Sequence, residues 1–86
     1  MRDIRFTPEA FAQYIEWEKT ERKVFSKINM LLQEIARNPF AGAGKPEPLK
    51  HELKGYWSRR ITDEHRLIYR AEEDYIKVIA CKLHYK

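Results

Sequence analysis

Cysteine is nearly absent from this 86-residue chain, which contains only Cys81. A single cysteine excludes a disulfide within the chain and is typical of proteins from a reducing compartment. The thiol lies in the apolar stretch YIKVIAC, so we expect a small buried residue rather than a nucleophile. Long apolar runs are also missing, since none approaches the roughly 20 residues that span a bilayer. The N-terminal MRDIRF lacks the apolar stretch of a signal peptide, and we therefore expect a cytoplasmic protein.

Glycine is scarce as well, and two of the three glycines lie in the stretch GAGK. A Walker-type phosphate loop needs GxxxxGK followed by Ser or Thr, whose hydroxyl binds the metal ion. Here Gly44 and Lys45 are followed by Pro46, which offers neither a hydroxyl nor an N–H group. The position five residues before Gly44 is Pro39. The sequence therefore argues against nucleotide binding at this stretch.

What the chain does contain is enough apolar residues for a core and a local excess of positive charge. Hydrophobic residues make up 43% and aromatic residues 13%, which is typical of a globular rather than a disordered chain. The length predicts one domain, spanning residues 1–86. Residues 45–70 contain seven Lys or Arg and four acids, so this segment carries +3 of the formal net charge of +4. Such an excess indicates a polyanionic partner, with a solvated charged surface as the alternative on composition alone.

The first half of the chain predicts a short strand and two helices. Residues 2–7 are typical of a strand, with alternate residues on one side. Thr7 can cap a helix and Pro8 is tolerated at the first helical position, so a helix begins here. An apolar stripe over 21–38 predicts a second helix, which Pro39 ends. The short break between the two helices indicates a helical hairpin.

The second half changes to a period of two after a predicted loop over 39–50. Strands are predicted at 56–62, 65–71 and 75–83, joined by short polar connections. Alternation places Arg59 on the same face as Trp57, and Arg66 on the face opposite Leu67. We therefore expect an α+β fold in which the N-terminal strand and the helical hairpin pack on a mostly antiparallel sheet, with arginines projecting from strands.

One carboxylate and three histidines are the candidates for proton transfer near neutral pH. Glu47 lies between Pro46 and Pro48 in GKPEPLK, and these prolines restrict the backbone on both sides. The histidines are His51, His65 and His84. Lone histidines are usually surface or packing residues, but His84 directly follows a predicted strand and precedes Tyr85. Terminal residues normally fray, so this His-Tyr pair is either idle or anchored at a site. Glu47 and the three histidines are therefore the candidates for general acid–base chemistry.

The run GKPEPLKHELKGYWSRRITDEHRLIYR, with the terminal HYK, resembles the YoeB/Txe toxins of the RelE superfamily, the toxin halves of bacterial type II toxin–antitoxin pairs. The resemblance covers essentially the whole chain. It implies a RelE-like α+β fold with helices on a curved sheet. It also implies an endoribonuclease that cleaves mRNA in the ribosomal A site, without a metal or other cofactor, and so inhibits translation. The partners implied are mRNA, the 70S ribosome and a cognate YefM/Axe-like antitoxin, and a homodimer is left open.

The resemblance also carries residue roles onto this sequence. The catalytic glutamate of the family matches Glu47, its phosphate-binding arginine matches Arg66 and its catalytic histidine matches His84. The family's terminal tyrosine matches Tyr85, but this chain adds Lys86, so a role for the terminal carboxylate does not carry over.

These residue types suit attack by the 2′-hydroxyl of the RNA on its own phosphate. We expect Glu47 to act as general base, Arg66 to stabilise the transition state and His84 to act as general acid. Tyr85 would stack on or orient a nucleotide, with packing at the sheet edge as the alternative. Lys50 and Arg60 are expected to bind backbone phosphates. The products would carry 2′,3′-cyclic phosphate and 5′-hydroxyl ends.

Two other functions remain open at this point. A non-catalytic toxin of the same fold could act on a topoisomerase, although such relatives generally lack the Glu/Arg/His set. A plain RNA- or ribosome-binding module could use the basic face without any chemistry. Salt would weaken the RNA binding of a nuclease and of a binding module alike, so binding data cannot separate the two. The end groups of the products can.

Overall fold

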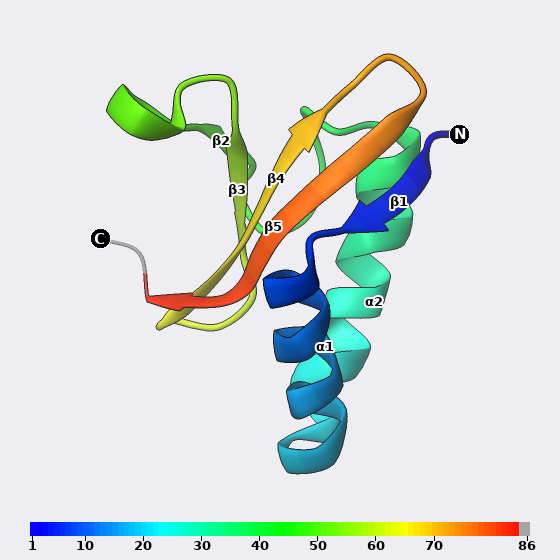
Figure 1. Ribbon diagram of the computed structural model, residues 1–86, viewed down its shortest axis with the longest axis vertical. Helices are drawn as coiled ribbons and strands as arrows, with labels where there is room; N and C mark the ends of the chain where they lie inside the picture. Colours follow the sequence, from blue (N-terminus) through cyan, green and yellow to red (C-terminus); the bar gives the residue numbers. More distant parts are fainter. Residues whose placement is uncertain (85–86) are drawn as a thin grey trace.

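The computed structural model describes residues 1–84, and side chains within residues 1–82. In chain order, the elements are β1 (Asp3–Phe6), α1 (Pro8–Thr20), α2 (Arg22–Arg37), β2 (Glu47–Pro48), the 3-10 helix η1 (His51–Leu53), β3 (Trp57–Arg60), β4 (His65–Ala71) and β5 (Tyr75–His84). The five strands form one sheet in the order β1-β5-β4-β3-β2, in which β1 runs parallel to β5 and every other pair is antiparallel (Figure 1). The predicted α+β fold is confirmed.

The two helices begin and end where local chemistry dictates. The Thr7 side chain accepts a hydrogen bond from the Ala10 N–H at 3.1 Å, and Pro8 follows it at the start of α1. Glu21 is extended (φ −147°), which separates α1 from α2. Asn38 is extended too, as expected for a residue that precedes proline. With 13 and 16 residues, neither helix in the described part of the chain is long and apolar enough to cross a membrane.

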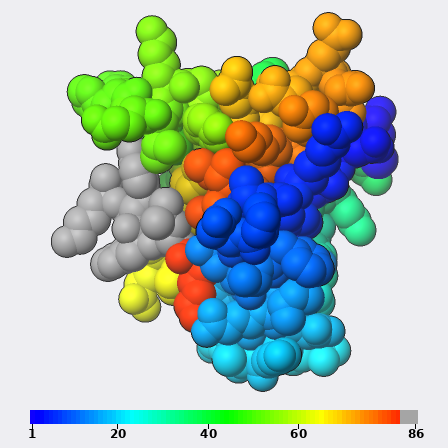
Figure 2. All heavy atoms as spheres, in the orientation of Figure 1, coloured from blue at the N-terminus to red at the C-terminus, as the bar shows by residue number. Residues whose placement is uncertain are grey.

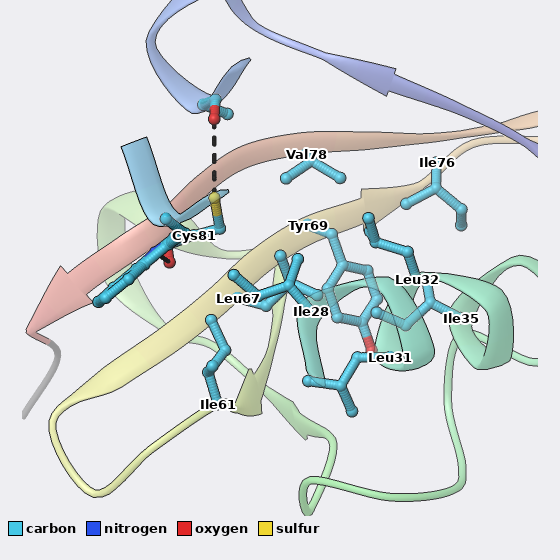
Figure 3. Packing of buried hydrophobic residues seen from close by; sticks show 12 residues of the cluster. Ile28, Leu31, Leu32, Ile35, Ile61, Leu67, Tyr69, Ile76, Val78 and Cys81 are labelled. Carbon is cyan, nitrogen blue, oxygen red and sulfur yellow. Dashed lines mark hydrogen bonds between the residues drawn. The ribbon is translucent and has the colours of Figure 1, made fainter. Parts of the chain in front are cut away.

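The core lies between the helical hairpin and one face of the sheet (Figure 3). Its buried members include Ile28, Leu31 and Ile35 from α2, Leu67 and Tyr69 from β4, and Ile76, Val78 and Cys81 from β5. Cys81 is fully buried, as predicted, and its thiol donates to the Ala10 carbonyl at 3.6 Å. Burial raises the pKa of this thiol to about 12, so it is protonated at neutral pH. Phe11 of α1 is half-exposed beside Phe6.

The connection between α2 and β3 differs from the predicted uninterrupted loop. Glu47 and Pro48 form the short strand β2, with Glu47 opposite Ser58 and Pro48 opposite Trp57 on β3. A two-residue strand containing proline gives no periodic signal, and it is tolerated because β2 lies at the edge of the sheet. The segment of β2 and η1 stands out at one end of the molecule, away from the turn between the helices (Figures 1 and 2).

Candidate functional site

A small pocket of about 60 Å³ lies on the sheet face that the helices do not cover, with room for a few water molecules. Its lining residues are Gly44, Lys45, Glu47, Ser58, Arg60 and Arg66. Three cations and one carboxylate give this lining a formal charge of +2. Guanidinium groups on neighbouring strands suit bidentate contact with phosphate oxygens, so the pocket favours an anionic ligand.

Glu47 is held by contacts on both sides of it in the sequence. On one side, the Gly44 carbonyl accepts a hydrogen bond from the Arg60 N–H at 2.7 Å. On the other side, Leu49 is buried against Ile68, and its N–H donates to the Tyr56 carbonyl at 2.9 Å. Between these anchors the Glu47 side chain is exposed at the edge of the pocket. Glu47 is thus an accessible carboxylate on a restrained backbone.

Arg66 enters the pocket from the start of β4, directly opposite Arg60 on β3. Its Nη1 donates to the carbonyls of Thr62 at 3.0 Å, His65 at 3.3 Å and Asp63 at 3.4 Å. These carbonyls belong to the turn between β3 and β4 and the first residue of β4, so local backbone orients the guanidinium. Within the described chain, neither arginine forms an ion pair with Glu47. The charged groups therefore surround the pocket without neutralising one another by direct contact.

The remaining predicted site residues lie in different surroundings. The backbone of His84 ends β5 opposite His65, one position beyond the residue that faces Arg66 across the two strands. The His84 side chain lies outside the described part of the structure, as do Tyr85 and Lys86. Lys50 is exposed at the start of η1 and does not line the pocket.

The last part of β5 pairs with β4 and is also attached to α1. The Gln13 side-chain oxygen accepts from the N–H groups of Cys81 at 2.8 Å and Lys82 at 3.0 Å. The Trp17 Nε1 donates to the Cys81 carbonyl at 2.8 Å, and its ring packs edge-on against His65 at 5.1 Å. The His65 Nδ1 is buried and finds no hydrogen-bond partner among the side chains of residues 1–82 or the described backbone. Side chains of α1 thus fix the strand that carries His84.

Sequence patterns alone did not place Gly44 or Ser58 in the site. The Gly44 φ is +82°, and a Cβ there would lie 3.0 Å from the Arg60 carbonyl oxygen, so this close approach requires glycine. Ser58 is buried opposite Glu47. The available signal was alternation, which places Ser58 on the same face of β3 as Arg60.

Comparison with known proteins agrees with the resemblance seen in the sequence. Residues 6–85 match the family model of the YoeB-like toxin of bacterial type II toxin–antitoxin systems. The toxin YoeB of Mycobacterium bovis is 49% identical over 85 residues, which cover 99% of this chain and 100% of the relative. The YoeB dimer of Staphylococcus aureus is 47% identical, with a TM-score of 0.91 and coverage of 98% of each chain. The heterotetrameric YoeB–YefM toxin–antitoxin complex of the same organism is 46% identical, with a TM-score of 0.90 and coverage of 99% of each chain.

Proposed function

The chain belongs to the YoeB-like toxins of bacterial type II toxin–antitoxin systems, and we propose that it is an endoribonuclease that cleaves mRNA in the ribosomal A site and thereby inhibits translation. The observation that carries this proposal is the pocket in which the exposed Glu47 faces Arg60 and Arg66 without an ion pair to either. A free carboxylate can accept a proton, and guanidinium groups can hold the phosphate beside it.

In the proposed reaction, Glu47 takes the proton of the RNA 2′-hydroxyl. The 2′-oxygen then attacks the adjacent phosphorus, and the bond from phosphorus to the 5′-oxygen of the next nucleotide breaks. Arg66 stabilises the charge that develops on the phosphoryl oxygens, and His84 gives a proton to the departing 5′-oxygen. The products are a 2′,3′-cyclic phosphate and a 5′-hydroxyl, and every step uses side chains of this chain alone.

The surroundings of Arg66 suit its proposed role. Three backbone carbonyls accept from Nη1 of Arg66, which leaves its other two guanidinium nitrogens available to bind phosphate oxygens. Groups held in place before the reaction stabilise the transition state without paying for reorganisation. Arg60 and the exposed Lys50 would bind neighbouring backbone phosphates, and Tyr85 would stack on or orient a nucleotide.

The proposed partners follow from the same assignment. The ribosome positions the mRNA, which places the activity in the cytoplasm. A YefM-like antitoxin would neutralise the toxin, as the S. aureus YoeB–YefM complex suggests by its composition. An acidic antitoxin segment would complement the +2 charge of the pocket lining. A homodimer of the free toxin is proposed by analogy with the S. aureus YoeB dimer.

The proposal is tested with ribosomes programmed with an mRNA that carries a single 2′-deoxy substitution at the mapped cleavage position. We expect the all-RNA message to be cut, with cyclic phosphate and 5′-hydroxyl ends, and the substituted message to stay intact. The same substitution one codon downstream, as a control, should leave cleavage unchanged. Cleavage of the substituted message at the same bond would contradict the mechanism, and intact all-RNA message would favour a binding module.

A further inference from the structure

Arg59 is the fully buried cation of the described chain, and the proposed reaction does not use it. Its Nε donates to the Tyr69 hydroxyl at 3.1 Å on the helix-facing side of the sheet. Its two terminal nitrogens donate to the carbonyls of Asn38 and Ala41, each at 2.8 Å, and of Ala43 at 3.2 Å. Burying an unpaired guanidinium costs several kcal/mol, so these bonds are what make the position tolerable.

The three carbonyls all belong to residues 38–44, which we call the Arg59 loop. Residues 40–43 are exposed, so few apolar contacts hold this part of the chain. The guanidinium therefore determines the conformation of the loop, because three loop carbonyls point inward and accept hydrogen bonds from it. The Tyr69 hydroxyl adds a fourth attachment by donating to the Pro39 carbonyl at 2.6 Å.

Glu34 of α2 closes the network from the other side. Its Oε1 accepts from the Ala43 N–H at 2.9 Å and from the Arg59 Nη1 at 3.4 Å. One carboxylate oxygen therefore connects the last turn of α2, the loop and the buried arginine. A Cβ on Gly42 would lie 2.5 Å from this oxygen, so the loop backbone passes directly against Glu34.

The Arg59 loop leads into the pocket. Its last residue, Gly44, accepts from the Arg60 N–H at 2.7 Å and lines the pocket. Only Lys45 and Pro46 separate Gly44 from Glu47, and Pro46 limits the backbone between them. A shift of the loop would therefore move the Glu47 carboxylate relative to Arg66.

We propose that Arg59 and Glu34 are positioning residues for Glu47: they fix the Arg59 loop, and the loop sets where the carboxylate stands in the pocket. This inference rests on the proposed function, because Glu47 must be the general base for its position to affect cleavage. A misplacement of about 1 Å can cost about 100-fold in rate, so the network acts on the chemical step rather than on binding.

The test measures how fast Glu34→Ala and Glu34→Gln cleave mRNA on purified ribosomes, at saturating and at subsaturating toxin concentrations. Glu34→Ala removes the oxygen that joins Ala43 to Arg59, whereas Glu34→Gln keeps an acceptor at the same place. We expect Glu34→Ala to lower the maximal cleavage rate by between about 5-fold and 100-fold, with the half-saturating toxin concentration unchanged. Glu34→Gln should stay within about 3-fold of wild type. Glu73→Ala, an exposed acid in the turn between β4 and β5, is the matched control.

Amide hydrogen exchange gives a second result that does not depend on activity. Because the network holds Gly44 against β3, Glu34→Ala should speed exchange at both the Ala43 and the Arg60 amides. Unchanged exchange at Arg60 would overturn the proposal, as would wild-type cleavage by Glu34→Ala or a Glu34→Gln variant as slow as Glu34→Ala.

Glu47→Gln in the same assay separates a failure of the positioning role from a failure of the proposed function. An inactive Glu47→Gln beside a fully active Glu34→Ala contradicts the positioning role and leaves the proposed function intact. A fully active Glu47→Gln contradicts the base assignment, and the positioning role fails with it.

Discussion

Replacing Tyr69 by phenylalanine is the sharpest test of what holds the buried arginine. The ring is fully buried and stays in place, so the change removes only the hydroxyl. That hydroxyl accepts from the Arg59 Nε at 3.1 Å and donates to the Pro39 carbonyl at 2.6 Å. Burial raises the pKa of Tyr69, so the hydroxyl remains a neutral donor at physiological pH.

The magnitude follows from the two lost bonds. A buried neutral hydrogen bond contributes about 0.5–1.5 kcal/mol, and a charged donor left without its partner costs about 1–3 kcal/mol. Tyr69→Phe should therefore lower the free energy of unfolding by about 2–4 kcal/mol, a large part of the stability of a small protein. Each kcal/mol corresponds to roughly 4–8 °C in melting temperature for a chain of this size.

Urea denaturation of three Tyr→Phe variants measures the effect. Tyr14 donates one bond, to the Asn29 Oδ1 at 2.6 Å in a partly buried position, and its variant should lose about 1 kcal/mol. Tyr75 lies with its ring against the Arg5 guanidinium, which phenylalanine preserves, so its variant should lose least. A Tyr69→Phe variant no less stable than Tyr75→Phe would refute the account of Arg59.

Three further predictions concern β5, the thiol and the pocket. Gln13→Leu removes the acceptor of the Cys81 and Lys82 amides, and hydrogen exchange at both should become faster than in Gln13→Glu, which keeps an acceptor. The Cys81 pKa is raised from its ordinary value of 9.0 to about 12, so the folded state holds one more proton than the unfolded state between these values. The free energy of unfolding should fall as pH rises through this window, by at most about 1.4 kcal/mol per pH unit, and less steeply in Cys81→Ala. Urea titrations at several pH values measure both slopes, and equal slopes would count against the raised pKa of Cys81. Arg60→Ala should weaken RNA binding and reduce the slope of log affinity against log salt by about 1, and an unchanged slope would argue against a phosphate contact.

Much of the sheet was predictable because alternation is a local signal. It placed Arg59 with Trp57 on the face that became the core, and Arg66 on the opposite face, where the pocket lies. Thr7 and Pro8 likewise predicted the start of α1, since capping depends on neighbouring residues alone.

What could not be predicted depends on contacts between distant segments. The partners of Arg59 are mostly backbone carbonyls of the loop 38–44. Every residue has a carbonyl, so the residue types in this loop do not show which carbonyls bind the arginine. Arg59 was therefore seen only as an arginine projecting from a strand. The pairing of Glu47 with Ser58 was missed because β2 has only two residues, Glu47 and Pro48, and so short a strand shows no period.

Whether Glu47 is the base of an RNA-cleaving site is decided by comparing cleavage rates. Wild type, Glu47→Gln and the control Glu73→Gln are added to ribosomes programmed with one mRNA, and transcript ends are mapped and timed. The account predicts that Glu47→Gln cuts about 10²–10⁴-fold more slowly than the other two while remaining folded. Cleavage by Glu47→Gln at the wild-type rate would contradict it.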